Sequence, residues 1–346
     1  MTLNSAAQLQ NKEESVENTS AAKPLDALST LLKDDMAQVN EVILRSMQSD
    51  VPMIPQLAGY LIAAGGKRLR PLLTLAAAKI FDENARPAHG LAAAVEFIHT
   101  ATLLHDDVVD GSEERRGQKA ANLIFGNQSA VLVGDFLFSR AFELMVESDN
   151  IRVLGILSKA SAVIAEGEVL QLAAQGQIDT SWETYLKVIE AKTAALFAAA
   201  CEVGPVIQGA TAQHAEALRL YGLYLGLAFQ IADDLLDYTG TLDTLGKNPG
   251  DDFLDGKLTA PVLLALQHAD ADEKEFWARI FTERNVEDGD LEHAQKLFAK
   301  HGSLDKAQEI ALSYAQKAVD ALEGLPPSPI TPILQKIPHY AVTRST

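Results

Sequence analysis

Two groups of aspartates with the same spacing are the first residues in this chain that could do chemistry. They are Asp106, Asp107 and Asp110, and Asp233, Asp234 and Asp237. One such group would also fit a solvated acidic helix end, but two copies with identical spacing favour a shared role. Mg²⁺ is commonly held by one or two carboxylates together with water and substrate phosphates. The six aspartates are therefore predicted to bind magnesium together with a diphosphate.

Each aspartate group stands at the end of a long apolar segment. Residues 91–110 read LAAAVEFIHTATLLHDDVVD, and residues 218–237 read LRLYGLYLGLAFQIADDLLD. Apolar residues three and four positions apart predict a helix in both segments. The C-terminal end of a helix is its negative end, so grouped carboxylates there cost some tenths to about 1 kcal/mol each. A bound cation would offset that cost, which supports the metal interpretation.

The composition predicts one large helical domain. The chain has 346 residues, of which 47% are hydrophobic, and no Pro/Gly/Ser-rich break divides it. Helical spacing recurs along the sequence, and we find no strand pattern. We expect an all-α domain over residues 25–346 after a disordered, polar extension over residues 1–24. In the helical segment 151–175, the polar residues Glu166, Glu168 and Gln171 are expected to form a polar rim rather than to do chemistry.

Charge and cysteine content limit the partners. The net charge of −18 argues against binding to nucleic acid or electrostatic docking on anionic lipid. Charges interrupt the apolar runs before the roughly 20 residues that a membrane span needs, and the polar N-terminus has no signal-peptide core. We expect a soluble, cytoplasmic protein. The single cysteine, Cys201, follows three alanines and is predicted to be buried rather than to act as a nucleophile.

Two short basic stretches flank the first aspartate helix in the sequence. Residues 65–71 read GGKRLRP and supply three cations in four residues, among them Lys67 and Arg70. Glycines and arginines just before a helix suit an anion, above all a diphosphate. Arg115 and Arg116 follow the first aspartates and could neutralise further phosphate charge. The alternative for this second stretch is a surface loop in which the arginines pair with neighbouring glutamates.

Two other lysine-bearing stretches are candidate phosphate ligands. Lys192 and Thr193 begin the apolar run KTAALFAAAC, where the lysine is either a surface residue or a ligand at a cavity mouth. Residues 238–261 are dense in Gly, Asp and Lys and could fold over a site. Lys247 and Lys257 are the candidate contacts in that segment.

These features together resemble those of the trans-isoprenyl diphosphate synthases, also called polyprenyl synthetases. GGKRLRP, the DDVVD of LLHDDVVD, RRG, the KT pair, FQ before the second DDLLD, and a later GK occur in the order typical of that family. The resemblance extends from about Leu25 to the C-terminus. It implies an all-helical isoprenoid synthase fold around a deep central cavity, and usually a homodimer.

The resemblance also implies a mechanism. Two or three Mg²⁺ ions on the six aspartates would draw off the diphosphate of an allylic substrate such as farnesyl or geranylgeranyl diphosphate. The resulting carbocation would alkylate isopentenyl diphosphate, and proton loss, with the released diphosphate as acceptor, would restore a double bond. The residues expected to hold isopentenyl diphosphate are Lys67, Arg70, His99 and Arg116. Those expected to hold the allylic diphosphate are Arg115, Lys192, Lys247 and Lys257. Those expected to act in catalysis are Asp106, Asp107, Asp110, Asp233, Lys192, Thr193 and Gln230, with Thr193 and Gln230 beside the cation.

Small residues before the first aspartates predict a long product. Ala101 and Thr102 lie about one turn before Asp106, where relatives that make short products resemble one another in carrying aromatic residues. The helix from Asp106 back to Leu91 is about 22 Å long, a depth that suits a long polyprenyl chain. We therefore expect an octaprenyl- to decaprenyl-type synthase that makes the side chain of a respiratory quinone such as ubiquinone.

Three alternatives remain at this stage. A farnesyl or geranylgeranyl diphosphate synthase is disfavoured by the small residues at Ala101 and Thr102. A terpene cyclase usually pairs its first aspartate motif with an Asn/Ser/Glu motif, whereas this chain has a second aspartate group. A non-catalytic subunit of a heteromeric synthase would be expected to have lost one group, and both are intact.

Overall fold

The computed structural model describes residues 23–63, 66–115, 117–239 and 250–343. The expected disordered extension therefore lies almost wholly outside the described residues. In the described part, helices dominate, as expected from the sequence, and the only strands are the two-residue pair β1 (Glu114–Arg115) and β2 (Gln118–Lys119). This short hairpin follows the first aspartate helix, and the expectation of no strand was wrong there.

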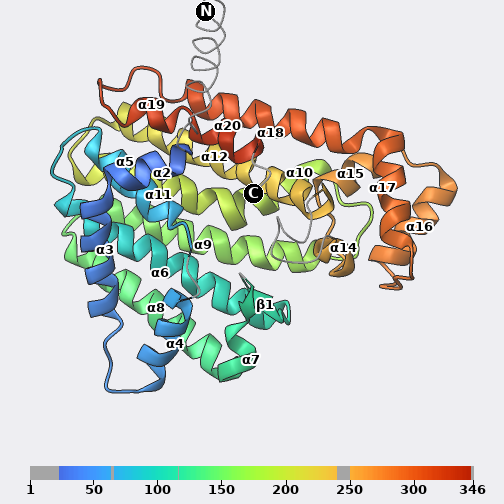
Figure 1. Ribbon diagram of the computed structural model, residues 1–346, viewed down its shortest axis with the longest axis horizontal. Helices are drawn as coiled ribbons and strands as arrows, with labels where there is room; N and C mark the ends of the chain where they lie inside the picture. The colour runs from blue at the N-terminus through green and yellow to red at the C-terminus, as the bar shows by residue number, and fades with distance from the viewer. Residues whose placement is uncertain (1–22, 64–65, 116, 240–249, 344–346) are drawn as a thin grey trace, which may run out of the picture.

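The helices pack into one bundle in which segments far apart in the sequence, such as α5 and α11, lie side by side (Figure 1). The N-terminal half contains α2 (Pro24–Leu31), α3 (Lys33–Ser46), α4 (Met53–Ala63), α5 (Leu69–Lys79), α6 (Arg86–Val109), α7 (Ala121–Phe125), α8 (Asn127–Glu147) and α9 (Ile151–Ala174). The middle contains α10 (Trp182–Ile189), the π-helix η1 (Glu190–Ala194), α11 (Ala195–Ile207) and α12 (Ala212–Thr239). The C-terminal part contains α14 (Asp251–Leu254), α15 (Ala260–Leu266), α16 (Ala271–Phe281), α17 (Asp290–His301), α18 (Ser303–Asp320), α19 (Thr331–Leu334) and α20 (Ile337–Thr343).

The two long helices that carry the aspartates, α6 and α12, belong to one packed bundle. Helix α6 packs mainly against α8, and α12 packs against α11 and α18. Helix α11 in turn packs on α5 and α9, so it links the two aspartate helices. Alanine and leucine fill much of this core, which lets helices approach closely while apolar surface is removed from water.

One close approach depends on a glycine in α12. A Cβ atom added at Gly222 would lie 2.3 Å from the backbone oxygen of Phe197 in α11. No larger residue fits this contact without displacing a helix, so the sequence fixes how deeply α11 and α12 interlock. The second aspartate group lies further along the same helix, and its position relative to α11 depends on this packing.

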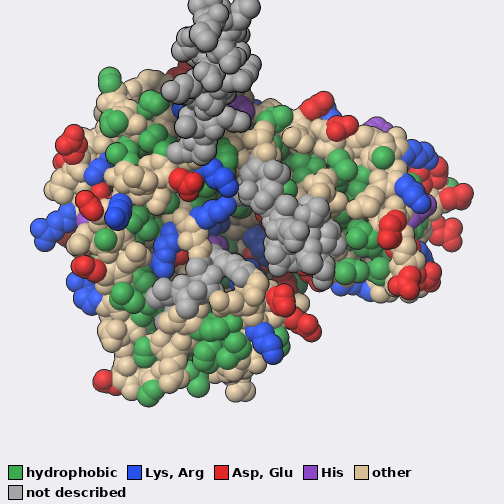
Figure 2. Space-filling view, viewed as in Figure 1, with side chains coloured by type: hydrophobic (Ala, Val, Ile, Leu, Met, Phe, Trp, Pro, Cys, Tyr) green, Lys and Arg blue, Asp and Glu red, His purple; other side chains and the backbone are tan. Residues whose placement is uncertain are grey.

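None of the described helices combines the length and apolar character that crossing a bilayer requires. Figure 2 shows lysine and arginine side chains gathered around a hollow near the middle of one face, and acidic side chains gathered over α16 and α17 at one end. The negative net charge is therefore unevenly distributed over this face.

Candidate active site

Each aspartate of the first group meets a different cation at the end of α6. Lys192 Nζ lies 3.4 Å from Asp106 Oδ2, and Lys257 Nζ lies 3.5 Å from Asp110 Oδ2. These two carboxylates share a face of the helix because they are four residues apart. Lys192 comes from η1 and Lys257 from the segment between α14 and α15. Three distant parts of the chain therefore meet at one end of α6.

Asp107 is held differently from its neighbours. Its side chain is almost fully buried and accepts hydrogen bonds from Nε and Nη2 of Arg115, both at 2.6 Å. Arg115 lies in β1, so the short hairpin places its guanidinium against α6. Within the described ranges, this arginine pairs with Asp107 and not with the adjacent glutamates. Asp107 fixes Arg115 at the site rather than standing open to a ligand.

A π-helix positions Lys192 and Thr193. The five residues of η1 widen the turn between α10 and α11, and single π-turns of this kind are frequent at functional sites. Lys192 Nζ lies 2.8 Å from Glu168 Oε2 in α9 as well as near Asp106. Burial by itself would lower the pKa of the Lys192 ammonium, but Asp106 and Glu168 outweigh it and raise the pKa. The lysine is therefore charged and half-buried at the site.

Glu168 belongs to this group of charges, contrary to its expected place in a polar rim. Its Oε1 atom is buried and has no hydrogen-bond partner among the described residues. Burial and the nearby Asp106 raise the pKa of the Glu168 carboxyl, and Lys192 opposes that rise. Burial likewise raises the pKa of Asp106, again opposed by Lys192. Two carboxylates that share one lysine in a desolvated place favour a further cation.

The second group has one exposed carboxylate and two buried ones. Asp233 is exposed, whereas Asp234 and Asp237 are buried. Asp234 accepts hydrogen bonds from the Tyr185 hydroxyl at 2.6 Å, from Gln230 Nε2 at 3.0 Å and from the backbone N–H of Ala260 at 3.1 Å. Burial raises the pKa of Asp234 to about 7, although these hydrogen bonds oppose the rise.

Asp237 ties the second group to the segment that carries Lys257. Its Oδ2 atom accepts a hydrogen bond from the backbone N–H of Asp252 at 3.0 Å, and its backbone oxygen accepts one from Gly250. Lys257 Nζ lies 3.8 Å from Asp252 Oδ1 and 3.0 Å from Asp255 Oδ2. The end of α12 therefore anchors the segment whose lysine reaches α6.

A cavity of about 200 Å³ lies beside the second aspartate group and next to the lysines that contact the first. Its lining includes Asp233 and Asp234 from α12 and the two lysines, Lys192 and Lys257, that contact the first group. Thr193 and Gln230 also line it, and Thr193 donates a 2.8 Å hydrogen bond from Oγ1 to Gln230 Oε1. The same amide then donates to Asp234. These two polar residues thus form a fixed pair at the cavity wall.

The predicted ligands of isopentenyl diphosphate that the structure describes lie just before α5, in α5 and in α6, and they do not line this cavity. Arg70 stacks over the ring of Phe197, with its guanidinium carbon 4.3 Å from the ring centroid, and so contacts α11. Lys67 is exposed just before α5, and His99 is half-buried in α6. Two further predicted ligands, Arg116 and Lys247, lie outside the described residues.

The residues expected to control chain length lie in α6 beside His99. Ala101 is fully buried, and Thr102 is half-buried with its hydroxyl donating to the backbone oxygen of His99 at 2.8 Å. Neither side chain is large enough to obstruct the interior on that side of the helix. Their effect on product length stays a prediction.

The donor atoms at the site fit Mg²⁺. In the described ranges, no three His, Cys, Asp or Glu side chains form a ready-made metal site. Mg²⁺ does not need one, because it usually keeps waters and takes only one or two carboxylates beside substrate phosphates. Asp106 and Asp110, which share a face at the end of α6, and Asp233, which is exposed and lines the cavity, are the carboxylates best placed for such a shared ion.

Sequence reasoning missed two supporting residues. Glu168 was predicted only to be part of a polar rim. The adjacent Gly167 was a sequence signal that another segment approaches closely at this point, and in the structure α9 packs on η1 there. Tyr185 lies 49 residues before its partner Asp234, and no spacing rule connects the two. Both contacts arise from packing between separate helices.

Comparisons with known proteins give one family. Residues 51–298 match the model of the family described as "Polyprenyl synthetase". The octaprenyl diphosphate synthase of Haemophilus influenzae is 43% identical over 324 residues, which cover 93% of this chain and 97% of that relative. A decaprenyl diphosphate synthase structure from Rhodobacter capsulatus matches with a TM-score of 0.90 and 51% identity over 93% of this chain and 99% of that one.

A third match bears on ligands. The polyprenyl synthase of Caulobacter crescentus, solved in complex with calcium and isoprenyl diphosphate, is 53% identical and matches with a TM-score of 0.89. The alignment covers 93% of this chain and 98% of that one. A related protein therefore binds a divalent cation and an isoprenyl diphosphate.

Proposed function

The chain belongs to the polyprenyl synthetase family, and on this premise we propose that it adds isopentenyl diphosphate repeatedly to an allylic diphosphate until the product has eight to ten units. The family, the all-α fold and the prenyltransferase activity are as the motifs predicted. Similarity to octaprenyl and decaprenyl synthases favours the long-chain prediction over the short-chain alternative.

The observation that carries the proposal is the link between the two aspartate groups. Lys192 and Lys257 each contact a carboxylate of the first group, and both line the cavity that Asp233 enters from the second. A diphosphate in this cavity would meet two ammonium groups. These cations stabilise negative charge on a departing diphosphate, where charge develops in the transition state.

When bound, Mg²⁺ would supply positive charge that makes a diphosphate a better leaving group. We propose Asp106, Asp110 and Asp233 as the direct ligands. Asp107 orients Arg115, and Asp234 and Asp237 are expected to contribute by holding Gln230 and the Lys257 segment in place. This assigns all six predicted aspartates to the site with two different tasks.

The remaining predicted residues keep their proposed roles. Arg115, Lys192 and Lys257 hold the allylic diphosphate, and Lys67, Arg70 and His99 hold isopentenyl diphosphate. Thr193 and Gln230 present oxygen atoms toward the cavity, where a carbocation next to the diphosphate would be stabilised by them. Arg116 and Lys247 complete the two sets by resemblance alone.

A homodimer is part of the proposal, and exposed apolar side chains support it. Leu132 and Val146 in α8 are 67% and 65% exposed, and Ile151 and Val169 in α9 are 79% and 67% exposed. Contiguous exposed apolar surface on a globular domain marks an interaction site, and these two neighbouring helices carry several such side chains. A second copy of the chain is the proposed occupant, with the two α8 helices at the interface.

A cytoplasmic location and a role in making the quinone side chain also stay predictions. Fractionation of cells that express the protein tests the first. Identification of the quinone whose side chain shortens or disappears when the protein is depleted tests the second.

The decisive experiment is product sizing. Purified protein is incubated with isopentenyl diphosphate, farnesyl diphosphate and Mg²⁺, and the dephosphorylated products are separated by chain length. We expect products of eight to ten units, none after removal of Mg²⁺ with a chelator, and full recovery when Mg²⁺ is restored. Arrest at three or four units would favour a short-chain synthase, and a cyclic hydrocarbon would favour a terpene cyclase.

A further inference from the structure

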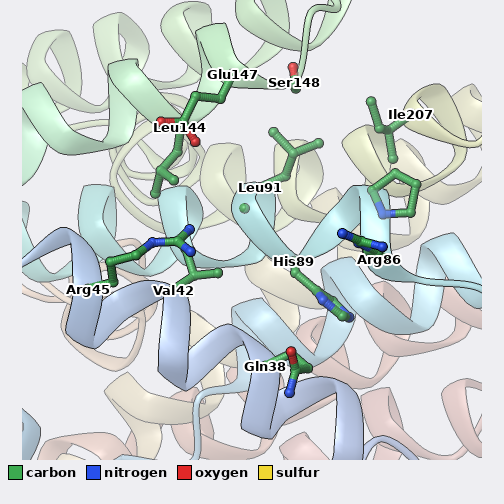
Figure 3. A pocket seen from close by; sticks show the side chains of 12 residues that line it. Gln38, Val42, Arg45, Arg86, His89, Leu91, Leu144, Glu147, Ser148 and Ile207 are labelled. Atoms are coloured by element: carbon green, nitrogen blue, oxygen red, sulfur yellow. The ribbon is translucent and has the colours of Figure 1, made fainter.

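A second cavity, larger than the one at the aspartates, lies at the opposite end of α6. It has a volume of about 810 Å³, and Val42, Leu91 and Ile207 from three different helices line part of it. Figure 3 shows Arg45 and Arg86 on opposite sides of this space. Both arginines are exposed, so neither side chain is held in one direction, as a group that acts on a reacting atom must be. The cavity at the aspartates differs, because buried polar side chains line it.

Tyr185 in α10 places a buried hydroxyl against the second aspartate group. The residue is 5% exposed, and its hydroxyl donates a 2.6 Å hydrogen bond to Asp234 Oδ2. The backbone N–H of Ala260 donates to the same oxygen at 3.1 Å. The other carboxylate oxygen, Oδ1, accepts from Gln230 Nε2 at 3.0 Å. Asp234 is thus an acceptor at both oxygens, and the two donors on Oδ2 determine that Oδ1 faces Gln230.

This carboxylate in turn determines how the amide of Gln230 is turned. A primary amide has a donor end, Nε2, and an acceptor end, Oε1. Because Nε2 donates to Asp234, Oε1 faces Thr193 and accepts a 2.8 Å hydrogen bond from its hydroxyl. With the amide reversed, Oε1 would face Asp234 Oδ1 and two acceptors would be opposed. The hydrogen bonds from Tyr185 to Thr193 therefore have one consistent set of directions.

The set of directions decides what Thr193 presents to the cavity that it lines. A hydroxyl has one hydrogen to donate and two lone pairs. The hydrogen of Thr193 is used on Gln230, so the lone pairs are left for the cavity. Lone pairs that are already oriented stabilise positive charge that develops in a transition state. With the Gln230 amide reversed, Thr193 would accept from Nε2 and could turn its hydrogen toward the same charge.

We propose that Tyr185 is a positioning residue for prenyl transfer, which acts through Asp234 and Gln230 to direct the oxygen of Thr193 at the carbocation. The inference rests on the proposed roles of Thr193 and Gln230 beside that cation. The ring of Tyr185 packs against Trp182, with the two ring centroids 5.0 Å apart, and belongs to the apolar cluster between α10, α12 and α15. Its hydroxyl is therefore fixed before any substrate binds.

Removing the hydroxyl alone tests this role. We expect Tyr185→Phe to lower the single-turnover rate of the first isopentenyl addition about tenfold, since hydrogen bonds to charged groups are among the stronger ones. The KM values of both diphosphates should stay unchanged, because the lost interaction operates only in the transition state. Tyr221→Phe is the matched control: Tyr221 is fully buried in α12, and its hydroxyl donates to the backbone oxygen of Leu334 at 3.0 Å, away from the cavity. Equal rates for the two variants would overturn the proposal.

A double-mutant cycle distinguishes positioning from a general structural effect. Thr193→Val removes the hydroxyl on which Tyr185 is proposed to act. If Tyr185 acts through Thr193, adding Tyr185→Phe to this variant lowers the rate by less than about twofold. If Tyr185 only supports the fold, the two losses multiply, and the proposal is wrong.

A second variant covers the case in which Tyr185→Phe does not fold. Asp234→Asn keeps the size of the side chain, and because Tyr185 and Ala260 donate to its remaining oxygen, its new amide nitrogen faces Gln230. This favours the reversed Gln230 amide. We expect the single-turnover rate to fall at least as far as in Tyr185→Phe, with the half-saturating Mg²⁺ concentration unchanged. An unchanged rate would contradict the proposal, and so would a raised Mg²⁺ requirement, which would show that Asp234 itself binds the ion.

The outcomes separate this inference from the proposed function. If the unchanged protein makes no prenyl product, the proposed activity itself fails. If it makes product but Thr193→Val keeps the full rate, the proposed role of Thr193 fails together with this inference. If Thr193→Val is slow but Tyr185→Phe is not, only the role of Tyr185 is wrong.

Discussion

Lys192 connects carboxylates of two helices, Asp106 in α6 and Glu168 in α9. An ammonium group held between two acids has a fixed direction, and its raised pKa keeps it protonated at neutral pH. A diphosphate that enters the cavity meets an ammonium group that is already oriented. The free energy of orienting Lys192 is therefore spent during folding and not during the reaction. Glu168 is therefore a positioning residue, since it acts through the lysine.

Replacing Glu168 by Gln tests this role. The amide keeps the size of the side chain but removes the charge that fixes Lys192, and hydrogen bonds to charged groups contribute about 1.5–3 kcal/mol. We expect kcat/KM for the allylic diphosphate to fall about tenfold or more. The control is Glu166→Gln, because Glu166 is exposed on the same helix. Equal kinetics for both variants would contradict a positioning role.

At the scale of elements, α9 and η1 must touch for this contact to form. Gly167 makes the contact possible, because an added Cβ atom would lie 2.6 Å from the Cβ atom of Ala191 and 3.2 Å from the backbone nitrogen of Lys192. The π-helix and the glycine therefore work as one unit. Together they bring the lysine to Glu168 and Asp106.

A pair of glycine substitutions in α9 checks the importance of this approach. Gly167→Ala is expected to destabilise the fold by about 1–3 kcal/mol through overpacking. Gly155→Ala is expected to stabilise it by up to about 1 kcal/mol, because no atom lies within 4 Å of the added Cβ and alanine favours a helix. Urea denaturation measures both. A stabilised Gly167→Ala variant would show that α9 and η1 are free to separate.

Helix α6 offers a second test at this scale. Replacing Ala101 by Phe introduces a ring where the side chain is now small and fully buried. We expect the product to shorten by several units, because position 101 lies only about one turn from Asp106 along the helix. Chromatography of the products measures the length, and an unchanged length would refute the proposed role of Ala101.

At the scale of the whole molecule, the exposed apolar side chains of α8 and α9 form the surface that we propose as the dimer interface. Helix α8 packs on α6, and α9 packs on η1. An interface on the outer faces of α8 and α9 would therefore make the helices that position the site more rigid. The dimer would in this way support activity without supplying a residue to the cavity.

A charge placed on this surface should separate the copies. Leu132→Glu is expected to give monomers in analytical ultracentrifugation, since an unpaired carboxylate at an apolar interface is costly to desolvate. Leu31→Glu in α2 places the same charge at another exposed leucine and should leave the oligomeric state unchanged. The same sedimentation coefficient for both variants would argue against an interface at α8.

The sequence by itself determined the family, the all-helical fold and the candidate role of the aspartates. It could do so because periodic apolar residues and repeated motifs are local features that can be recognised without a structure. It also identified Lys192, Thr193, Gln230 and Lys257, which the structure brings to one cavity with the second group.

Only the tertiary structure decided which carboxylates are exposed and which are buried. Asp233 and Asp234 are adjacent residues of the same group, yet Asp233 is exposed and Asp234 is buried against Tyr185. The difference depends on which helices pack beside α12. The same holds for the ion pair between Glu168 and Lys192 and for the cavity that Val42, Leu91 and Ile207 line. Both form because segments far apart in the chain pack together, and residue spacing does not predict such packing.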